Sequence, residues 1–233
     1  MIYALLNRKG GVGKTTIAIH LADALSRRGR RVLLIDADSQ QSAMTWSNVR
    51  PQEPRFSVIG MPKATLHKEI GSLSADYDDV VIDGPPRVAD VAKSIIMAAD
   101  LVILPVQPSQ LDVWATADTV DLLNDARIFK ETLKSVFVIN RRMGNTVVGR
   151  EVRHALEALD VQVMDSDIAQ RVAYVESITS GQTVSDLNPA SKAAIEFESF
   201  VTELVRTYDQ KTHDEHAAKG TPKKRRPVDR KPD

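Results

Sequence analysis

Ten residues near the N-terminus, 7–16 (NRKGGVGKTT), constrain the fold of this chain more than any other stretch. The apolar run 2–6 precedes them and predicts a buried strand, whereas Ile17, Leu21 and Leu25 follow at four-residue spacing and predict a helix. A glycine-rich loop between a strand and a helix is the context of a phosphate-binding loop. Its glycines let several backbone N–H groups point at one anion, beside the positive end of the helix dipole.

Two lysines give this loop its character. Lys14 is placed to reach the β- and γ-phosphates of a nucleotide, and the Thr15 hydroxyl is placed to ligate Mg²⁺. The loop departs from the common G-x-x-x-x-G-K-[ST] pattern, because Arg8 stands where the first glycine is usual. A second lysine, Lys9, stands directly ahead of the glycine pair. Lys9 is therefore the residue that distinguishes this loop from an ordinary one.

Apolar runs recur along the chain with helical stretches between them, which predicts an α/β fold with a doubly wound, mainly parallel sheet flanked by helices. Strands are expected at 2–6, 31–36, 56–59, 79–83, 101–106, 136–140 and 161–164. Further helices are expected at about 63–74, 90–98, 112–128, 147–158 and 189–208. We expect a single domain, 1–209, followed by a basic, disordered C-terminal tail, 210–233.

Charge is unevenly placed, although 31 Lys/Arg balance 31 Asp/Glu. Residues 211–233 hold eight Lys/Arg and four Asp/Glu, which leaves 23 basic and 27 acidic residues in 1–210. DNA binding by this mildly acidic body would need a local basic patch. The chain has no cysteine, so disulfides and Cys-ligated clusters are excluded. It shows neither an apolar run of membrane-spanning length nor a leader segment, and we expect a cytoplasmic protein.

Carboxylates follow two of the predicted strands. Asp36 and Asp38 lie at the end of the strand 31–36, and Asp83 ends the strand 79–83. The carboxyl ends of parallel strands share the edge where ligands bind, and both Mg²⁺ and an attacking water need carboxylates there. Each aspartate taken alone could instead be a helix cap or a turn residue.

The sequence K-G-G-x-G-K-T-T resembles the deviant Walker A motif of the ParA/MinD superfamily of dimerising ATPases, and is most similar to the small, ParF-like partition proteins. The resemblance implies that Lys9 crosses a dimer interface and contacts the nucleotide of the other subunit. It also implies ATP/ADP and Mg²⁺ as cofactors, with Lys9 and Lys14 acting in catalysis. The nucleotide-binding residues that it implies are Lys9, Gly10, Gly11, Val12, Gly13, Lys14, Thr15 and Thr16.

Two further segments resemble the catalytic elements of that family. Residues 36–42 resemble its D-x-D-P-Q element, with a serine in place of the proline, which implies that Asp38 positions the hydrolytic water and Asp36 supports the Mg²⁺ region. Residues 83–86 resemble its Walker B and switch segment. There Asp83 would hold Mg²⁺ through water, and the turn that senses the γ-phosphate would contain Gly84 and Pro85.

Later segments suggest the dimer, base and DNA contacts. Residues 105–112 resemble a family segment near the dimer interface, which implicates Pro108 and Asp112; the alternative is a strand exit with Asp112 starting a helix. Asn140 is a candidate adenine contact. Residues 167–177 resemble the late loop and helix that line the base and carry DNA-binding residues in several members. The candidate DNA-binding residues are Arg171 and, in the tail, Lys223, Lys224, Arg225 and Arg226.

The function that this resemblance implies is a weak, partner-stimulated ATPase that forms a homodimer on ATP and binds nonspecific DNA of the nucleoid. A small ParB-like or adaptor protein would be its partner, and its cargo a plasmid or chromosome. One alternative is a protein cargo, such as a carboxysome or a chemotaxis cluster. Another is a metabolic ATP-dependent enzyme on the same scaffold, against which Lys9 argues. Residues 222–227 offer no apolar side chain to insert, so we expect no membrane partner.

Overall fold

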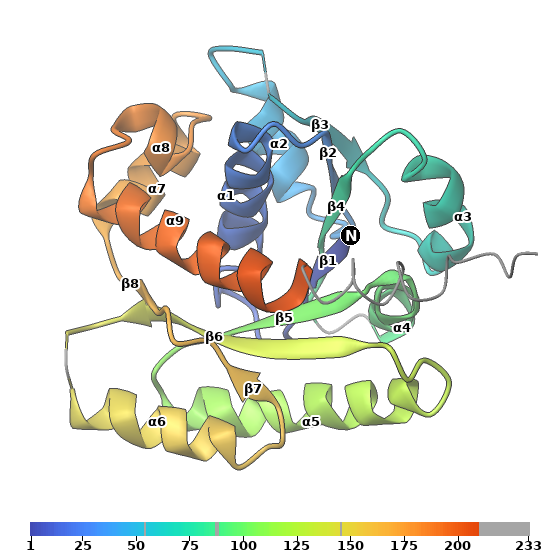
Figure 1. Ribbon diagram of the computed structural model, residues 1–233, viewed down its shortest axis with the longest axis vertical. Helices are drawn as coiled ribbons and strands as arrows, with labels where there is room; N and C mark the ends of the chain where they lie inside the picture. The colour runs from blue at the N-terminus through green and yellow to red at the C-terminus, as the bar shows by residue number, and fades with distance from the viewer. Residues whose placement is uncertain (54, 87–88, 145, 210–233) are drawn as a thin grey trace, which may run out of the picture.

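The computed structural model describes residues 1–53, 55–86, 89–144 and 146–209, which build a parallel sheet between two layers of helices (Figure 1). Its strand order is β3-β2-β4-β1-β5-β6-β7, with β8 paired to β6, and the strand pairings in the described residues are parallel. The strands are β1 (Ile2–Leu5), β2 (Val32–Asp36), β3 (Ser57–Gly60), β4 (Asp79–Asp83), β5 (Leu101–Val106), β6 (Lys134–Arg142), β7 (Gln162–Val163) and β8 (Ile168–Ala169). The predicted doubly wound α/β fold is confirmed.

Helices cover both faces of the sheet, because the central strands are buried on both sides and read as continuous apolar runs. One layer contains α1 (Lys14–Arg27), α2 (Ser42–Asn48), α7 (Val172–Thr179), α8 (Val184–Leu187) and α9 (Lys192–Leu204), which continues into the π-helical turn η1 (Val205–Asp209). The other contains α3 (Leu66–Leu73), α4 (Ala89–Ala98), α5 (Gln110–Arg127) and α6 (Val147–Glu157). No helix among the described residues is long and apolar enough to cross a membrane.

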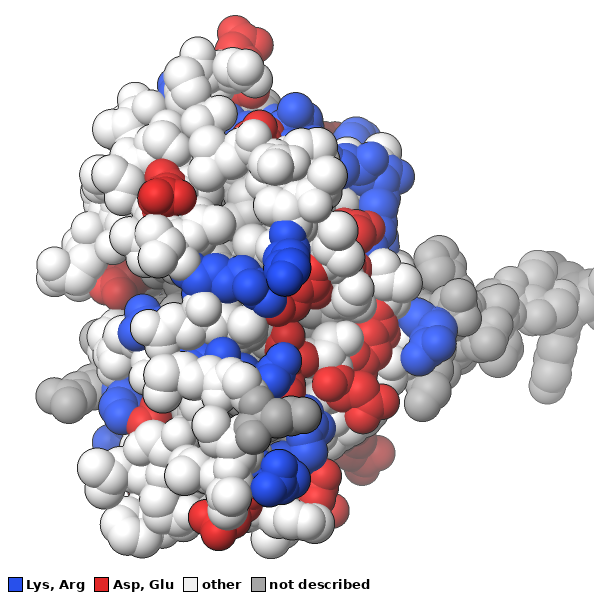
Figure 2. Space-filling view, turned by 90° about the vertical axis from the view of Figure 1, so that its left-hand side faces the viewer, with Lys and Arg blue, Asp and Glu red and all other residues white. Residues whose placement is uncertain are grey.

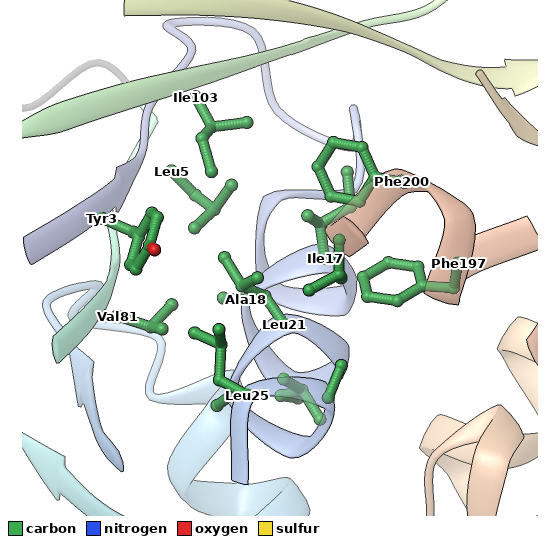
Figure 3. Packing of buried hydrophobic residues seen from close by; sticks show 14 of the residues in the cluster. Tyr3, Leu5, Ile17, Ala18, Leu21, Leu25, Val81, Ile103, Phe197 and Phe200 are labelled. Atoms are coloured by element: carbon green, nitrogen blue, oxygen red, sulfur yellow. The ribbon is translucent and has the colours of Figure 1, made fainter. Parts of the chain in front are cut away.

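Helix α1 is the most deeply buried helix of its layer. Ile17, Leu21 and Leu25 are fully enclosed in a cluster that also contains Leu5 of the sheet and Phe197 and Phe200 of α9, and Ile17 lies nearest these two rings (Figure 3). Each such side chain contributes about 1.5–3 kcal/mol on burial. The four-residue spacing that predicted this helix therefore also fixes its position over the centre of the sheet, and with it the loop that precedes it.

Three short elements were not predicted from the sequence: α2, α8 and β8. The expectation that 161–164 completes the sheet was wrong in part, because β7 is an edge strand of two residues and β8 follows it on β6. The last long helix begins at Lys192 and not at 189, since Ser191 caps it by accepting a hydrogen bond from the Ala194 N–H (3.2 Å). The domain boundary at 209 stays a prediction, because residues 210–233 lie outside the described residues.

The strand order places the glycine-rich loop at a switch in winding direction. The chain runs from β1 outward to β2 and β3, returns through β4, and then crosses β1 to β5 and β6. In sheets of this kind ligands bind at the carboxyl ends of the strands beside the point where the winding reverses. The loop after β1 lies at that point.

Candidate functional site

The glycine-rich loop, residues 6–13, joins β1 to α1 and is braced by the exit of β5. Gly11 and Gly13 have φ angles of 77° and 99°, in the left-handed region that favours glycine. The Asn7 side chain donates a hydrogen bond to the Pro105 carbonyl (2.8 Å), and the Gln107 side chain donates one to the Gly11 carbonyl (3.0 Å). The loop is thus held from two sides without using the N–H groups that would face an anion.

Asn140, near the end of β6, also holds this loop in place. Its Nδ2 donates to the Val12 carbonyl (2.7 Å), and a Cβ on Gly13 would lie 2.2 Å from that nitrogen. Gly13 is therefore required by close approach as well as by its φ angle. Asn140 also lines a cavity beside the loop, so its contact with adenine stays a prediction alongside the bracing role that is observed.

Lys14 begins α1 and is almost fully buried, with its Nζ 3.5 Å from the Lys9 carbonyl oxygen. Burial lowers the pKa of this lysine, while the nearby carboxylates of Asp83 and Asp38 raise it. Because this ammonium is largely removed from water, its attraction to a phosphate bound in the loop would be only weakly screened.

Thr15 and Asp83 form the pair that fits a magnesium ion. The Thr15 hydroxyl donates to Asp83 Oδ2 (2.6 Å), whereas the buried Oδ1 has no hydrogen-bond partner among the described residues. Burial raises the pKa of Asp83 to about 7, against the lowering effect of the Thr15 hydrogen bond. A hydroxyl beside an unpartnered carboxylate oxygen is the donor set that Mg²⁺ takes in nucleotide sites, so these residues fit the ion.

Asp36 and Asp38 lie at the same edge but differ in their contacts. The buried Asp36 carboxylate accepts backbone N–H groups of Asp38 (3.1 Å), Ala43 (2.9 Å) and Met44 (3.0 Å). It therefore caps α2, and burial raises its pKa against these hydrogen bonds. Asp38 is half-buried and accepts the Gln40 N–H (3.0 Å) in a local turn. Their roles toward Mg²⁺ and water stay predictions.

The turn after β4 passes directly under the entry to the loop. Gly84 donates its N–H to the Leu5 carbonyl (3.0 Å), and a Cβ there would lie 2.4 Å from Leu6 Cδ2 and 2.7 Å from that oxygen. Pro85 is buried and lines a cavity of about 360 Å³ together with Asn7. The turn is therefore in direct contact with the strand end from which the loop begins, and its role in sensing the γ-phosphate stays a prediction.

Lys9 and Asp112 form an ion pair within one chain, from the loop to the first turn of α5. Asp112 is 1% exposed, whereas the Lys9 side chain is 38% exposed at the mouth of the site. Beside this pair, Leu111 and Trp114 are large apolar residues left in solvent, at 65% and 63% exposure. Pro108 lies half-buried just before the helix. The structure thus brings Lys9 and Asp112 into contact, and the assignment of Lys9, Pro108 and Asp112 to a dimer interface stays a prediction.

The candidate DNA-binding residues are only partly described. Arg171 pairs with Glu196 (2.8 Å), and Arg142 and Arg153 share Asp167 (3.2 and 2.6 Å). Figure 2 shows the face that lies at the left of Figure 1, and on it basic and acidic side chains are interspersed. The tail residues Lys223, Lys224, Arg225 and Arg226 lie outside the described residues. A DNA role for Arg171 stays a prediction.

A cavity of about 720 Å³ opens beside the loop and is lined by Gly13, Thr16, Asn140, Arg141 and residues of α7. This volume is typical of small-molecule sites. Its position next to Gly13 and Thr16 suits the base and sugar of a nucleotide whose phosphates lie in the loop. Arg141, Asn7 and Gln107 also form part of the site, although they were not among the candidate residues predicted from the sequence. For Asn7 and Arg141 the signal was a polar residue directly after a strand.

The loop, the Thr15–Asp83 pair and the adjoining cavity define a P-loop nucleotide-binding protein. The sequence model of the CobQ/CobB/MinD/ParA nucleotide binding domain family matches residues 3–184, and the chain belongs to this family.

Two relatives are similar to this chain in sequence, and a solved structure is similar to it in fold. The maintenance of carboxysome distribution protein A of Halothiobacillus neapolitanus is 29% identical over 206 residues, covering 87% of this chain and 95% of that protein. The chromosome-partitioning ATPase Soj of Thermus thermophilus is 27% identical over 234 residues, covering 87% and 94%. The structure of a cobyrinic acid a,c-diamide synthase from Mycobacterium smegmatis with bound ATP analogue and magnesium has a TM-score of 0.72 at 20% identity, covering 90% and 96%.

Proposed function

We propose that this chain is a Mg²⁺-dependent ATPase that dimerises on ATP, binds nonspecific DNA and thereby positions a cargo. The observation that carries the proposal is Lys9, a second lysine at the mouth of the loop, paired with Asp112 beside the exposed Leu111 and Trp114. An apolar surface next to a charged group of the site suits an interface that another subunit completes.

The proposal gives each residue of the site a separate role. Lys14 neutralises the β- and γ-phosphates, Thr15 and Asp83 hold Mg²⁺, and Asp38 orients the attacking water. Phosphoryl transfer leaves little covalent chemistry to the protein, so positioning and charge stabilisation supply the rate. Mg²⁺ held by Thr15 and Asp83 would supply charge neutralisation for the phosphates.

Dimerisation responds to the nucleotide because of the two lysines. Two subunits that meet at this face bring Lys9 and Lys14 of each close together, and these cations repel one another unless triphosphates lie between them. ATP therefore favours the dimer, and its hydrolysis weakens it. ADP carries less charge to neutralise the lysines and should leave the chain monomeric.

Two cargo classes are supported by the similar proteins. The name of one relative refers to carboxysome distribution, and that of the other to chromosome partitioning. We infer a cytoplasmic, nucleoid-associated protein stimulated by a small ParB-like or adaptor partner. Deletion of the gene, followed by microscopy of protein bodies and by counts of plasmid and chromosome loss, separates the two classes.

The central test is light scattering after size-exclusion chromatography. The Asp38→Ala variant should be monomeric with ADP–Mg²⁺ and dimeric with ATP–Mg²⁺, and adding Lys9→Ala should abolish the dimer. Lys63→Ala is the matched control, because Lys63 is an exposed lysine that pairs only weakly with Glu69 at 3.6 Å. A monomer in both nucleotides would refute the proposal and favour a metabolic enzyme, since a diamide synthase shares this fold.

A further inference from the structure

Arg141 has a backbone conformation that its side chain does not favour. Its φ angle is 57°, in the left-handed region, at the point where β6 shifts register against β8 between Asn140 and Arg142. The strain is held in place by a hydrogen bond from the Arg141 N–H to Asn140 Oδ1 (2.9 Å). Bulges of this kind re-aim a side chain, and strained residues concentrate at ligand sites.

The Arg141 side chain is exposed and has no hydrogen bond or ion pair with any described residue. Its neighbours differ in this respect. Arg142 contacts Asp167 (3.2 Å) and the Gly144 carbonyl (2.9 Å), and Arg171 contacts Glu196 (2.8 Å). Of these three arginines, therefore, only Arg141 has a guanidinium that can bind a ligand without first breaking an existing contact.

Arg141 is one of the residues that line the cavity of about 720 Å³ beside the loop. Arg141 lines it from β6, Gly13 and Thr16 line it from the phosphate side, and Val172 and Val175 line it from α7. Both valines are largely exposed, at 70% and 66%. A planar cation and apolar side chains around one cavity match the two needs of a purine base, a π-face to stack on and apolar surface to cover.

We propose that Arg141 is a nucleotide-binding residue whose guanidinium stacks on the face of the purine base. This inference rests on the proposed function and extends it to the base. The guanidinium is planar and weakly hydrated, so it stacks on aromatic rings where an ammonium does not. Glycine would adopt this left-handed backbone more easily, but it would leave the cavity without a guanidinium.

The test is calorimetric titration of the full chain with ATP–Mg²⁺ and, separately, with inorganic tripolyphosphate–Mg²⁺. Arg141→Ala and Arg141→Lys should each weaken ATP binding by about tenfold, the size of a desolvated cation–π contact. Both should bind tripolyphosphate as the parent does, since the loop and Lys14 are unchanged. Arg142→Ala is the matched control and should bind both ligands as the parent does.

A further variant guards against a purely structural effect. Arg141→Gly relieves the strained φ, so its melting temperature should be no lower than that of the parent, while its ATP affinity falls as in Arg141→Ala. Equal ATP binding by Arg141→Ala and the parent would overturn the inference. So would an equal loss of ATP and tripolyphosphate binding, since Arg141 would then act on the phosphates or the fold. A parent that binds neither ligand would instead refute the proposed function itself.

Discussion

Lys9 and Asp112 form an ion pair in which Asp112 is buried and Lys9 is partly exposed, and this difference determines how much the loss of either side chain would destabilise the fold. Asp112 is enclosed and one of its oxygens, Oδ2, has no hydrogen-bond partner among the described residues, whereas Lys9 is partly in solvent. Removing one partner of a buried pair leaves an uncompensated charge, and this cost is reduced where solvent reaches the pair. The lysine therefore stabilises the isolated chain by neutralising Asp112.

Lys9→Ala should lower the free energy of unfolding by about 1–2 kcal/mol, because it leaves the Asp112 carboxylate buried and unpaired. Adding Asp112→Asn should restore most of the loss. Urea unfolding of the two single variants and the double variant measures the coupling. Arg8→Ala is the control, since Arg8 and Asp118 are both more than half exposed and should contribute little. Additive losses in the double variant would contradict the pairing.

Gly84 is constrained by contact and Gly71 is not, which makes them a matched pair. Gly84→Ala should destabilise the protein by about 2 kcal/mol, because its Cβ would meet Leu5 O and Leu6 Cδ2. Gly71→Ala, at an exposed position of helix α3 with nothing within 4 Å of the added Cβ, should stabilise by about 0.5–1 kcal/mol. Thermal unfolding checks both signs, and a neutral Gly84→Ala would show that the turn is free to move.

Residue types and spacing predicted the phosphate end of the site well. Lys14, Thr15 and Asp83 meet as expected, because glycine spacing and strand ends are local features of the sequence. Asp36 caps α2, which is one of the two roles that the sequence allows, and its role toward Mg²⁺ stays a prediction. The left-handed conformation of Arg141 was beyond prediction, since it depends on the register of β8 against β6.

At the scale of elements, the helices and strands that could be predicted are those long enough to show a repeating apolar pattern. Helix α2 was missed because it spans seven residues and is initiated by Gln41 in a left-handed conformation and by the distant Asp36 carboxylate. Strand β8 was missed because two residues carry no periodic signal, and only its pairing with β6 defines it. Short elements held by tertiary contacts leave little trace in a single sequence.

His20 links α1 to α8 and makes this contact sensitive to pH. Its Nδ1 donates to the Thr16 carbonyl (2.7 Å) and its Nε2 accepts the Val184 N–H (3.1 Å), which requires the neutral ring. Burial lowers its pKa to about 4, although the Thr16 carbonyl, Asp23 and Asp186 raise it. The unfolded chain therefore takes up the proton first as the pH falls.

The neutral His20 should contribute full stability above pH 6.5 and lose it progressively as the pH falls to about 4, by roughly 3 kcal/mol in total. Asp83 has the opposite effect on stability between its ordinary pKa and pH 7. Its raised pKa favours the protonated folded state, so its contribution to the free energy of unfolding grows as the pH falls through this range. The His20 effect is therefore read as the difference between the parent and His20→Gln in urea unfolding from pH 4 to 8. A constant difference across this range would exclude the buried neutral histidine.

At the scale of the whole molecule, charge separates the body from the tail. Residues 1–210 carry more acids than bases, and Arg142, Arg153 and Arg171 are paired with Asp167 or Glu196. The paired arginines offer a phosphate backbone little net attraction, whereas residues 211–233 hold eight Lys/Arg against four acids. A dimer doubles whatever contacts each chain makes, so DNA affinity should depend on both the nucleotide and the tail.

We therefore expect Asp38→Ala with ATP to bind a nonspecific duplex at low salt, and the same variant without residues 211–233 to bind at least tenfold more weakly. Each lost phosphate contact should also reduce the slope of log affinity against log salt by about one. Fluorescence anisotropy over a range of salt concentrations with ATP or ADP measures both quantities, and unchanged ATP-dependent dimerisation verifies that the truncated chain is intact. Full affinity without the tail would place the DNA contacts on the body, with Arg171→Ala as the next variant to titrate. If the full chain showed no ATP-dependent DNA binding, the proposed association with the nucleoid would be rejected, whereas the proposed ATPase activity would be unaffected.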